Sequence, residues 1–134
     1  MSKPINVILI DDNEIDIVVN TKLLKIGNLT DDINAFKTCK ELLNYLEENK
    51  ASLNDTLNVL LLDIQMPVVS GFECLDKIQK LHPEFHNDAL TFMLSSSIDR
   101  RDIEIAEANT SILKVLEKPL DVYLLARLIE AYQP

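Results

Sequence analysis

Charged and hydroxyl side chains follow four short apolar runs of this sequence, in each case where the run ends. They are Asp11 and Asp12, Asp63, Ser95 with Ser96, and Lys118. A carboxylate can act as a nucleophile and accept a phosphoryl group, and ammonium or hydroxyl groups can bind the oxygens of that group. These residue types therefore predict phosphoryl chemistry, provided that the fold brings the four positions together.

Three carboxylates in one place also indicate a metal ion. Like charges repel strongly at short range unless a cation lies among them. Ligands that are all oxygen favour a hard cation, and Mg²⁺ combines a few protein ligands with water and a phosphate oxygen. We therefore expect Mg²⁺ as the cofactor at Asp11, Asp12 and Asp63.

The apolar runs that precede these residues are typical of buried strands. They are short and nearly continuous, as in parallel sheets that are covered on both faces. The four runs are Ile5–Ile10, Leu57–Leu62, Ala89–Leu94 and Ile112–Leu116. A fifth, weaker strand is expected at Ile33–Phe36, at an edge of the sheet because Asn34 interrupts it.

Helical patterns separate the runs. Residues 13–26 carry apolar side chains at steps of three and four, and Gly27 is a natural stop. The apolar side chains of that helix are Ile15, Val18, Val19, Leu23 and Ile26. Capping-box spacing opens two more helices, at Thr38 with Glu41 and at Ser70 with Glu73.

Two further helices are expected at about 99–109 and 121–132, the last with Leu125, Leu128 and Tyr132 on one side. The alternation predicts an α/β fold of five βα units, (βα)5, with helices on both faces of a parallel sheet. Ligands of such sheets bind beyond the carboxyl ends of the strands, which is where the polar residues lie.

Composition limits the classes of function. The 134 residues fit one domain, and a net charge of −9 disfavours nucleic acid or anionic membranes as partners. The run Ile5–Ile10 is too short for a signal peptide or a membrane span, so we expect a cytoplasmic protein. Cys39 and Cys74 are then expected as reduced thiols, and His82 and His86 as parts of a solvated loop.

Taken together, the motifs resemble the receiver domain of bacterial two-component response regulators. The residues that carry the resemblance, in this order, are Asp11-Asp12, Asp63-Ile64-Gln65-Met66-Pro67 with Gly71, Leu94-Ser95-Ser96, and Lys118-Pro119. The resemblance implies a flavodoxin-like doubly wound sheet of strand order 2-1-3-4-5, the order for which a receiver protein serves as a standard example. It also implies a single receiver domain over residues 1–134 without an output domain, which accepts phosphoryl groups without being an enzyme.

The resemblance assigns a role to each residue. Asp63 would accept the phosphoryl group from a phosphohistidine on a sensor histidine kinase or a histidine phosphotransfer protein. Mg²⁺ would be bound by Asp12, Asp63 and the backbone carbonyl of Gln65, and by Asp11 through water. Lys118 would bind the phosphoryl oxygens. Ser95, with Ser96 beside it, would be the switch whose hydroxyl moves to form a hydrogen bond with the phosphoryl group. Gln65 and Ser97 would tune the lifetime of the phosphoryl group, and Pro119 would follow a cis peptide bond.

One position departs from the pattern of the family. An aromatic residue usually stands three residues before the lysine, and here that residue is Val115. The output surface and the unknown output partner are therefore left open by the sequence.

Other interpretations are weaker. A non-phosphorylated receiver acting as an interaction module would not need the complete set of site residues. A phosphohydrolase of the haloacid dehalogenase type would need a second aspartate where Gln65 stands. A nucleotide or flavin module would need a glycine-rich loop after the first strand. Taken singly, Asp11 and Asp12 could be helix caps and Lys118 a surface lysine.

Overall fold

The computed structural model describes residues 3–96 and 99–133. Five strands form one parallel sheet in the order β2-β1-β3-β4-β5. They are β1 (Ile5–Ile10), β2 (Ile33–Phe36), β3 (Leu57–Asp63), β4 (Leu90–Ser95) and β5 (Ile112–Glu117). The predicted doubly wound fold is confirmed, and β2 lies at an edge as expected.

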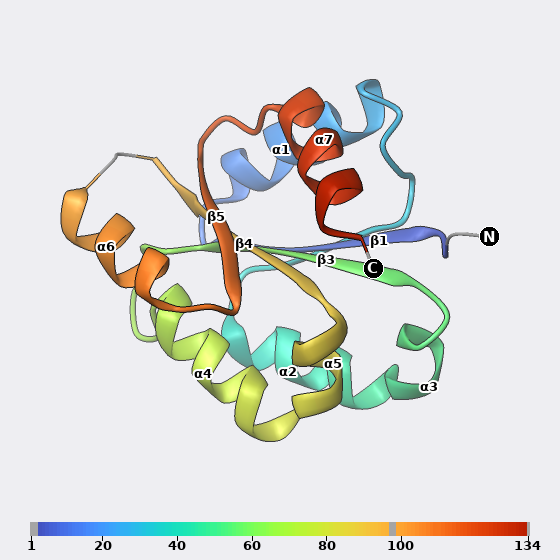
Figure 1. Ribbon diagram of the computed structural model, residues 1–134, viewed down its shortest axis with the longest axis horizontal. Coiled ribbons are helices and arrows are strands. Elements are labelled where there is room, and N and C mark those ends of the chain that lie inside the picture. The colour runs from blue at the N-terminus through green and yellow to red at the C-terminus, as the bar shows by residue number, and fades with distance from the viewer. Residues whose placement is uncertain (1–2, 97–98, 134) are drawn as a thin grey trace.

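Helices cover both faces of the sheet (Figure 1). On one face lie α1 (Glu14–Ile26) and α7 (Val122–Tyr132). On the other lie α2 (Cys39–Glu48), α3 (Lys50–Leu53), α4 (Gly71–Leu81) and α5 (Pro83–Asp88). The remaining helix, α6 (Arg100–Ala108), buries Ala106 in the core of this second face. The short helices α3 and α5 were not predicted.

The strands are continuously apolar because their side chains alternate between two cores. Ile8 and Ile10 of β1 pack into the core beneath α2 and α4, whereas Val7 and Leu9 pack into the core beneath α1 and α7. Both faces of the sheet are thus shielded from water. For this reason the strands do not alternate between apolar and polar residues in the sequence.

The helix starts that the sequence predicted are confirmed. The Thr38 hydroxyl accepts a hydrogen bond from the Glu41 amide, and the Ser70 hydroxyl accepts one from the Glu73 amide, both at 3.2 Å. Asp99 caps α6 by accepting a hydrogen bond from the Arg101 amide at 2.9 Å. Each cap satisfies a backbone donor that the first helical turn leaves without a partner.

The apolar face predicted for α1 is correct only at Leu23, which is partly buried against the core beneath α1 and α7. Ile15, Val18, Val19 and Ile26 are 73%, 51%, 40% and 77% exposed. The buried residues of α1 are Asn20 and Leu24. The helix is oriented by long-range contacts, since Asn20 Oδ1 accepts a hydrogen bond from the Leu120 amide at 3.1 Å.

In α7 the buried residues are Val122, Leu125 and Ile129, while Tyr132 is exposed. The predicted grouping of Leu125 with Leu128 and Tyr132 is therefore only partly correct.

The predicted solvated loop around His82 and His86 is also wrong. His82 lies between α4 and α5, His86 lies within α5, and both are buried. The short helix folds against the start of the sheet, which a local polar sequence does not reveal. No helix among the described residues is long and apolar enough to cross a membrane.

The prediction of two reduced thiols is overturned as well, because Cys39 and Cys74 form a disulfide. Cys39 is the first residue of α2, and Cys74 lies in the first turn of α4. Packing of these two helices on one face of the sheet brings the Cα atoms to 5.7 Å across a separation of 35 residues. Such a pairing leaves no signal in the spacing of two cysteines.

Candidate functional site

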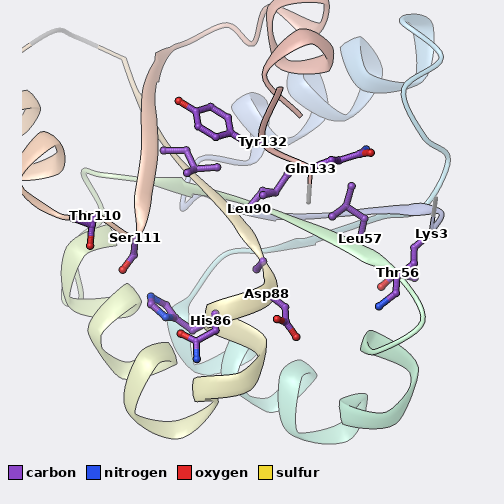
Figure 2. A pocket seen from close by; sticks show the side chains of 13 residues that line it. Lys3, Thr56, Leu57, His86, Asp88, Leu90, Thr110, Ser111, Tyr132 and Gln133 are labelled. Atoms are coloured by element: carbon purple, nitrogen blue, oxygen red, sulfur yellow. The ribbon is translucent and has the colours of Figure 1, made fainter. Parts of the chain in front are cut away.

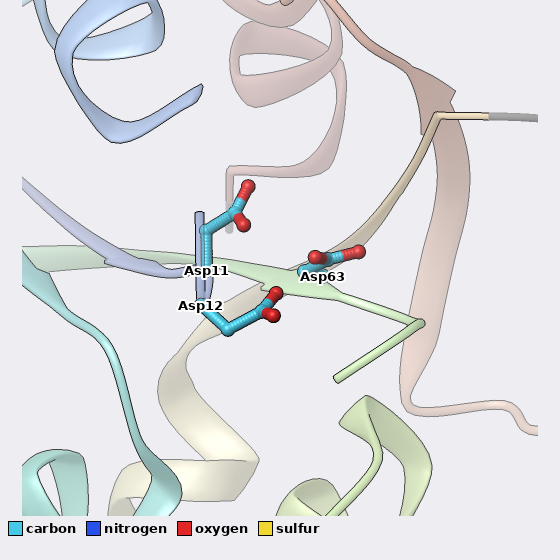
Figure 3. A group of neighbouring side chains, drawn as sticks. All are labelled: Asp11, Asp12 and Asp63. Atoms are coloured by element: carbon cyan, nitrogen blue, oxygen red, sulfur yellow. The ribbon is translucent and has the colours of Figure 1, made fainter. Parts of the chain in front are cut away.

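Three carboxylates meet at the carboxyl edge of the sheet (Figure 3). Asp11 and Asp12 follow β1, and Asp63 is the last residue of β3. One oxygen from each lies within 4.8 Å of those from the other two. Asp11 and Asp63 are buried and Asp12 is exposed. An all-oxygen set of this kind fits a hard divalent cation, with Asp12 open to water that would complete the coordination.

The loop after β1 fixes Asp11 through its backbone and its side chain. The Asp11 amide donates to the Phe36 carbonyl of the neighbouring strand at 3.0 Å. Oδ1 of Asp11 accepts a hydrogen bond from the Asn13 amide at 2.9 Å. Asn13 itself caps α1, accepting from the amides of Ile15 and Asp16. The cap of α1 is therefore Asn13, and neither Asp11 nor Asp12 serves in that role.

Asp63 is held by the loop that joins β3 to α4. Its Oδ1 accepts a hydrogen bond from the Gln65 amide at 3.2 Å. The loop closes where the Gly71 amide donates to the Ile64 carbonyl at 3.0 Å. A Cβ at Gly71 would overlap the Asp63 carbonyl oxygen, so the first residue of α4 has to be glycine for this approach.

Lys118 connects the carboxylates from the opposite side of the site. Its Nζ donates to Oδ2 of Asp11 at 2.7 Å, to Oδ2 of Asp16 at 3.0 Å and to Oδ2 of Asp63 at 3.2 Å. The side chain of Lys118 is only 9% exposed. Its backbone amide donates to the Ser95 carbonyl at 2.8 Å, and the Lys118-Pro119 peptide is cis, as predicted.

The electrostatics of the site follow from this packing. Burial raises the pKa of Asp63 to about 6, and the charge of Asp11 adds to the rise, while Lys118 opposes it. Burial disfavours the charged form of Lys118, but its hydrogen bonds to Asp11 and Asp16 outweigh this and raise the pKa above its usual value. Without a metal ion, the single ammonium group of Lys118 offsets only part of the charge of the carboxylates around it.

The serines predicted for the site lie at the same edge. Ser95 ends β4 and is buried, whereas Ser96 is exposed. Ser96, Lys118 and Asp16 line a shared hollow of about 220 Å³. Ser97 lies outside the described residues.

Val115 is partly buried and borders a second cavity, of about 470 Å³, which Ser95 also lines. Open volume thus remains next to Ser95 on the side of β5 that carries Val115.

Two residues of the site were missed by the sequence analysis. Asp16 accepts a hydrogen bond from Lys118. Asn20 accepts one from the backbone amide of Leu120, two residues after Lys118. Both lie on α1, one turn apart, and Asp16 is four residues after Asp12 in the sequence. That spacing puts polar groups on the face of α1 that meets the site, and it was the available signal.

A separate cavity of about 750 Å³ opens at the opposite edge of the sheet (Figure 2). Leu57 and Leu90, the first residues of β3 and β4, line it together with His86. The length of β3, about 20 Å, separates it from Asp63. Both ring nitrogens of His86 are shielded from solvent and lack a hydrogen-bond partner among the described residues.

Comparisons with known proteins agree with the site. The family model for the response regulator receiver domain matches residues 7–130. The crystal structure of a two-component response regulator from Cytophaga hutchinsonii is 29% identical, with a TM-score of 0.86 over 96% of each chain. A response regulator receiver protein from Dyadobacter fermentans is 32% identical, with a TM-score of 0.85 over 95% of this chain and 96% of the other. No protein with a curated description matches.

Proposed function

Because this chain belongs to the family of response regulator receiver domains of two-component signalling, we propose that it accepts a phosphoryl group on Asp63. The donor is a phosphohistidine of a histidine kinase or of a histidine phosphotransfer protein. The observation that carries the proposal is the convergence of Asp11, Asp12 and Asp63 with Lys118, which links two of these carboxylates directly.

The transfer is a displacement at phosphorus. An oxygen of Asp63 forms a bond to phosphorus while the phosphorus–nitrogen bond of the phosphohistidine breaks, and the imidazole leaves with that electron pair. The raised pKa of about 6 leaves Asp63 mostly ionised at pH 7, as a nucleophile requires. Lys118 Nζ, 3.2 Å from Asp63 Oδ2, is placed to bind an oxygen of the transferred group.

A divalent cation fits the same residues. Asp12, Asp63 and the Gln65 carbonyl would hold Mg²⁺, with Asp11 acting through water. Bound there, Mg²⁺ would supply positive charge that offsets the negative charge of the phosphoryl group.

The exposed apolar residues of α1 give the donor protein a surface to contact. Ile15, Val18 and Val19 lie in the first two turns after the site, and Val19 lines the same hollow as Lys118. A macromolecule that carries a phosphohistidine to Asp63 has to cover this edge of the sheet. Exposed aliphatic side chains beside a reacting group are typical of such contacts.

The response to phosphorylation is assigned to Ser95 and its loop. Val115 has no polar tip and few rotamers, so it does not replace the aromatic residue of the family. With beryllofluoride bound to Asp63 as a phosphoryl mimic, we expect the Ser95 hydroxyl to move while Val115 stays in place. A structure in which Ser95 keeps its position would contradict this assignment. Gln65 and Ser97 carry no carboxylate, so neither is a strong base for attack by water, and we assign them the lifetime of the phosphoryl group.

We further propose that this single domain works in the cytoplasm, signals by protein contact or onward transfer, and is not an enzyme in its own right. Its net charge of −9 supports a protein partner over nucleic acid or an anionic membrane.

The direct test is mass spectrometry after incubation with acetyl phosphate and Mg²⁺. Wild type should gain the mass of one phosphoryl group, and Asp63→Asn should gain none. Equal labelling of both proteins, or no labelling of wild type, would show that the proposal is wrong. The second outcome would leave an interaction module that is not phosphorylated.

A further inference from the structure

Val68 lies in the loop between β3 and α4 in a conformation that valine rarely adopts. Its φ is 64°, and the Val69 amide donates to the Pro67 carbonyl at 2.7 Å, closing a three-residue γ-turn around it. This left-handed region crowds Cβ against the backbone, and a β-branched side chain suffers most. The side chain is 99% exposed, so no packing within the described protein compensates for the strain.

The loop around Val68 imposes this conformation. Gly71 closes the loop on Ile64 and packs against the Asp63 carbonyl, while Ser70 caps α4. The other described non-glycine residue with positive φ is Asn28, at 55°. Asparagine tolerates this region because its short polar side chain can form local hydrogen bonds, whereas the branched side chain of Val68 cannot. Strained residues cluster at active sites, at ligand-binding clamps and in switch regions, where the strain serves the function.

The surface beside Val68 is hollowed. A groove of about 560 Å³ runs between the β3–α4 loop and the start of α6. One wall carries Met66, Pro67 and Phe72, and the other carries Asp99 and Asp102. Gln65 also lines the groove, so the groove borders the phosphoryl site. An apolar wall facing an acidic one fits a partner segment that combines an aliphatic or aromatic side chain with lysine or arginine.

We propose that Val68 is a specificity-determining contact for the protein that donates the phosphoryl group, an inference that rests on the proposed function. The donor buries Val68 in an apolar pocket and directs a basic side chain toward Asp99 and Asp102. The donor is the occupant that the geometry favours, because it must bring its phosphohistidine to Asp63, which ends β3 five residues before Val68. The γ-turn presents the side chain in a fixed position, which reduces the ordering cost of binding.

The test compares Val68→Asn with a matched control, Leu81→Asn. Leu81 is 60% exposed at the far end of α4, remote from the site. Both variants and wild type receive phosphoryl groups from acetyl phosphate and from a panel of autophosphorylated histidine kinases and phosphotransfer proteins of the source genome. Loss of one buried valine contact should lower the ratio of protein-donor rate to acetyl phosphate rate about 10- to 100-fold in Val68→Asn. The ratio for Leu81→Asn should equal that of wild type.

The melting temperature separates the loss of a donor contact from a general loss of stability. Val68→Asn relieves the strained backbone, so its melting temperature should rise although transfer becomes slower. Asp102→Asn should lower the rate with protein donors mainly at low salt, because exposed charges act over a screened range.

The outcomes are distinguishable. Wild-type transfer by Val68→Asn, or an equal loss with acetyl phosphate and with protein donors, overturns the inference. The inference is also overturned if acetyl phosphate labels the wild type but none of the protein donors does. A wild type that acetyl phosphate fails to label instead counts against the proposed function.

Discussion

The disulfide between Cys39 and Cys74 should contribute a large part of the stability of this domain. It joins the first residue of α2 to the first turn of α4, and both cysteines are buried in the core beneath these helices. A cross-link restricts the unfolded chain far more than the folded one, because the two Cα atoms already lie close together in the native state. Removing the bond should therefore lower the free energy of unfolding.

The size of the effect follows from the separation of 35 residues. In the chain-entropy description, closing a loop of this length stabilises the folded state by about 4 kcal/mol at 25 °C. The shift in melting temperature equals this loss of free energy divided by the entropy of unfolding, which scales with chain length. For 134 residues, the melting temperature should fall by roughly 10–15 °C. Reduction keeps both sulfur atoms in the core, so it changes the cross-link with little change in packing.

Calorimetry with and without a strong reductant measures this difference directly. Cys39→Ala, Cys74→Ala and the double variant complete the series. All three should melt near the reduced wild type, and reductant should leave their melting temperatures unchanged. A wild type that melts at the same temperature in both conditions, or whose mass shows two free thiols after purification in air, would refute the reasoning.

Four further predictions concern the site. Lys118→Met leaves buried carboxylates without their ammonium partner, so it should lower the unfolding free energy in EDTA by about 3 kcal/mol or more, and an unchanged denaturation midpoint would contradict this. Asp63 binds its proton more tightly in the folded state, because folding raises its pKa from 3.8 to about 6. The wild type therefore loses stability as the pH rises between these two values. Asp63→Asn should therefore gain stability relative to wild type from pH 4 to 6 in EDTA, with a level difference above that range; a constant difference across the range would oppose this. Asp12→Ala should weaken Mg²⁺ binding more than Asp11→Ala, and titration calorimetry giving the reverse order would disprove the assigned ligand set. Gly71→Ala should cost roughly 1–3 kcal/mol in urea melts, because its Cβ would overlap the Asp63 carbonyl, and wild-type stability would show that the loop gives way freely.

The sequence by itself determined the parts of this protein that depend on local pattern. Continuous apolar runs predicted the strands, because a parallel sheet with two dry faces has no polar alternation. Thr38 and Ser70 predicted helix starts, because a cap satisfies backbone donors within three residues of itself. The ends of the runs predicted where Asp11, Asp63 and Lys118 would meet, because parallel strands share one carboxyl edge.

The tertiary structure alone decided the features that depend on distant partners. The buried face of α1 carries Leu24, which packs in the core shared with α7, and Asn20, which accepts a hydrogen bond from Leu120, 100 residues away in the sequence. Asp16 joined the site through Lys118, 102 residues away, and the two cysteines paired across two helices. In each case, contacts between elements select one orientation or pairing among several that the local sequence permits, and the spacing of Asp16 and Asn20 in the sequence does not name Lys118 or Leu120 as their partners.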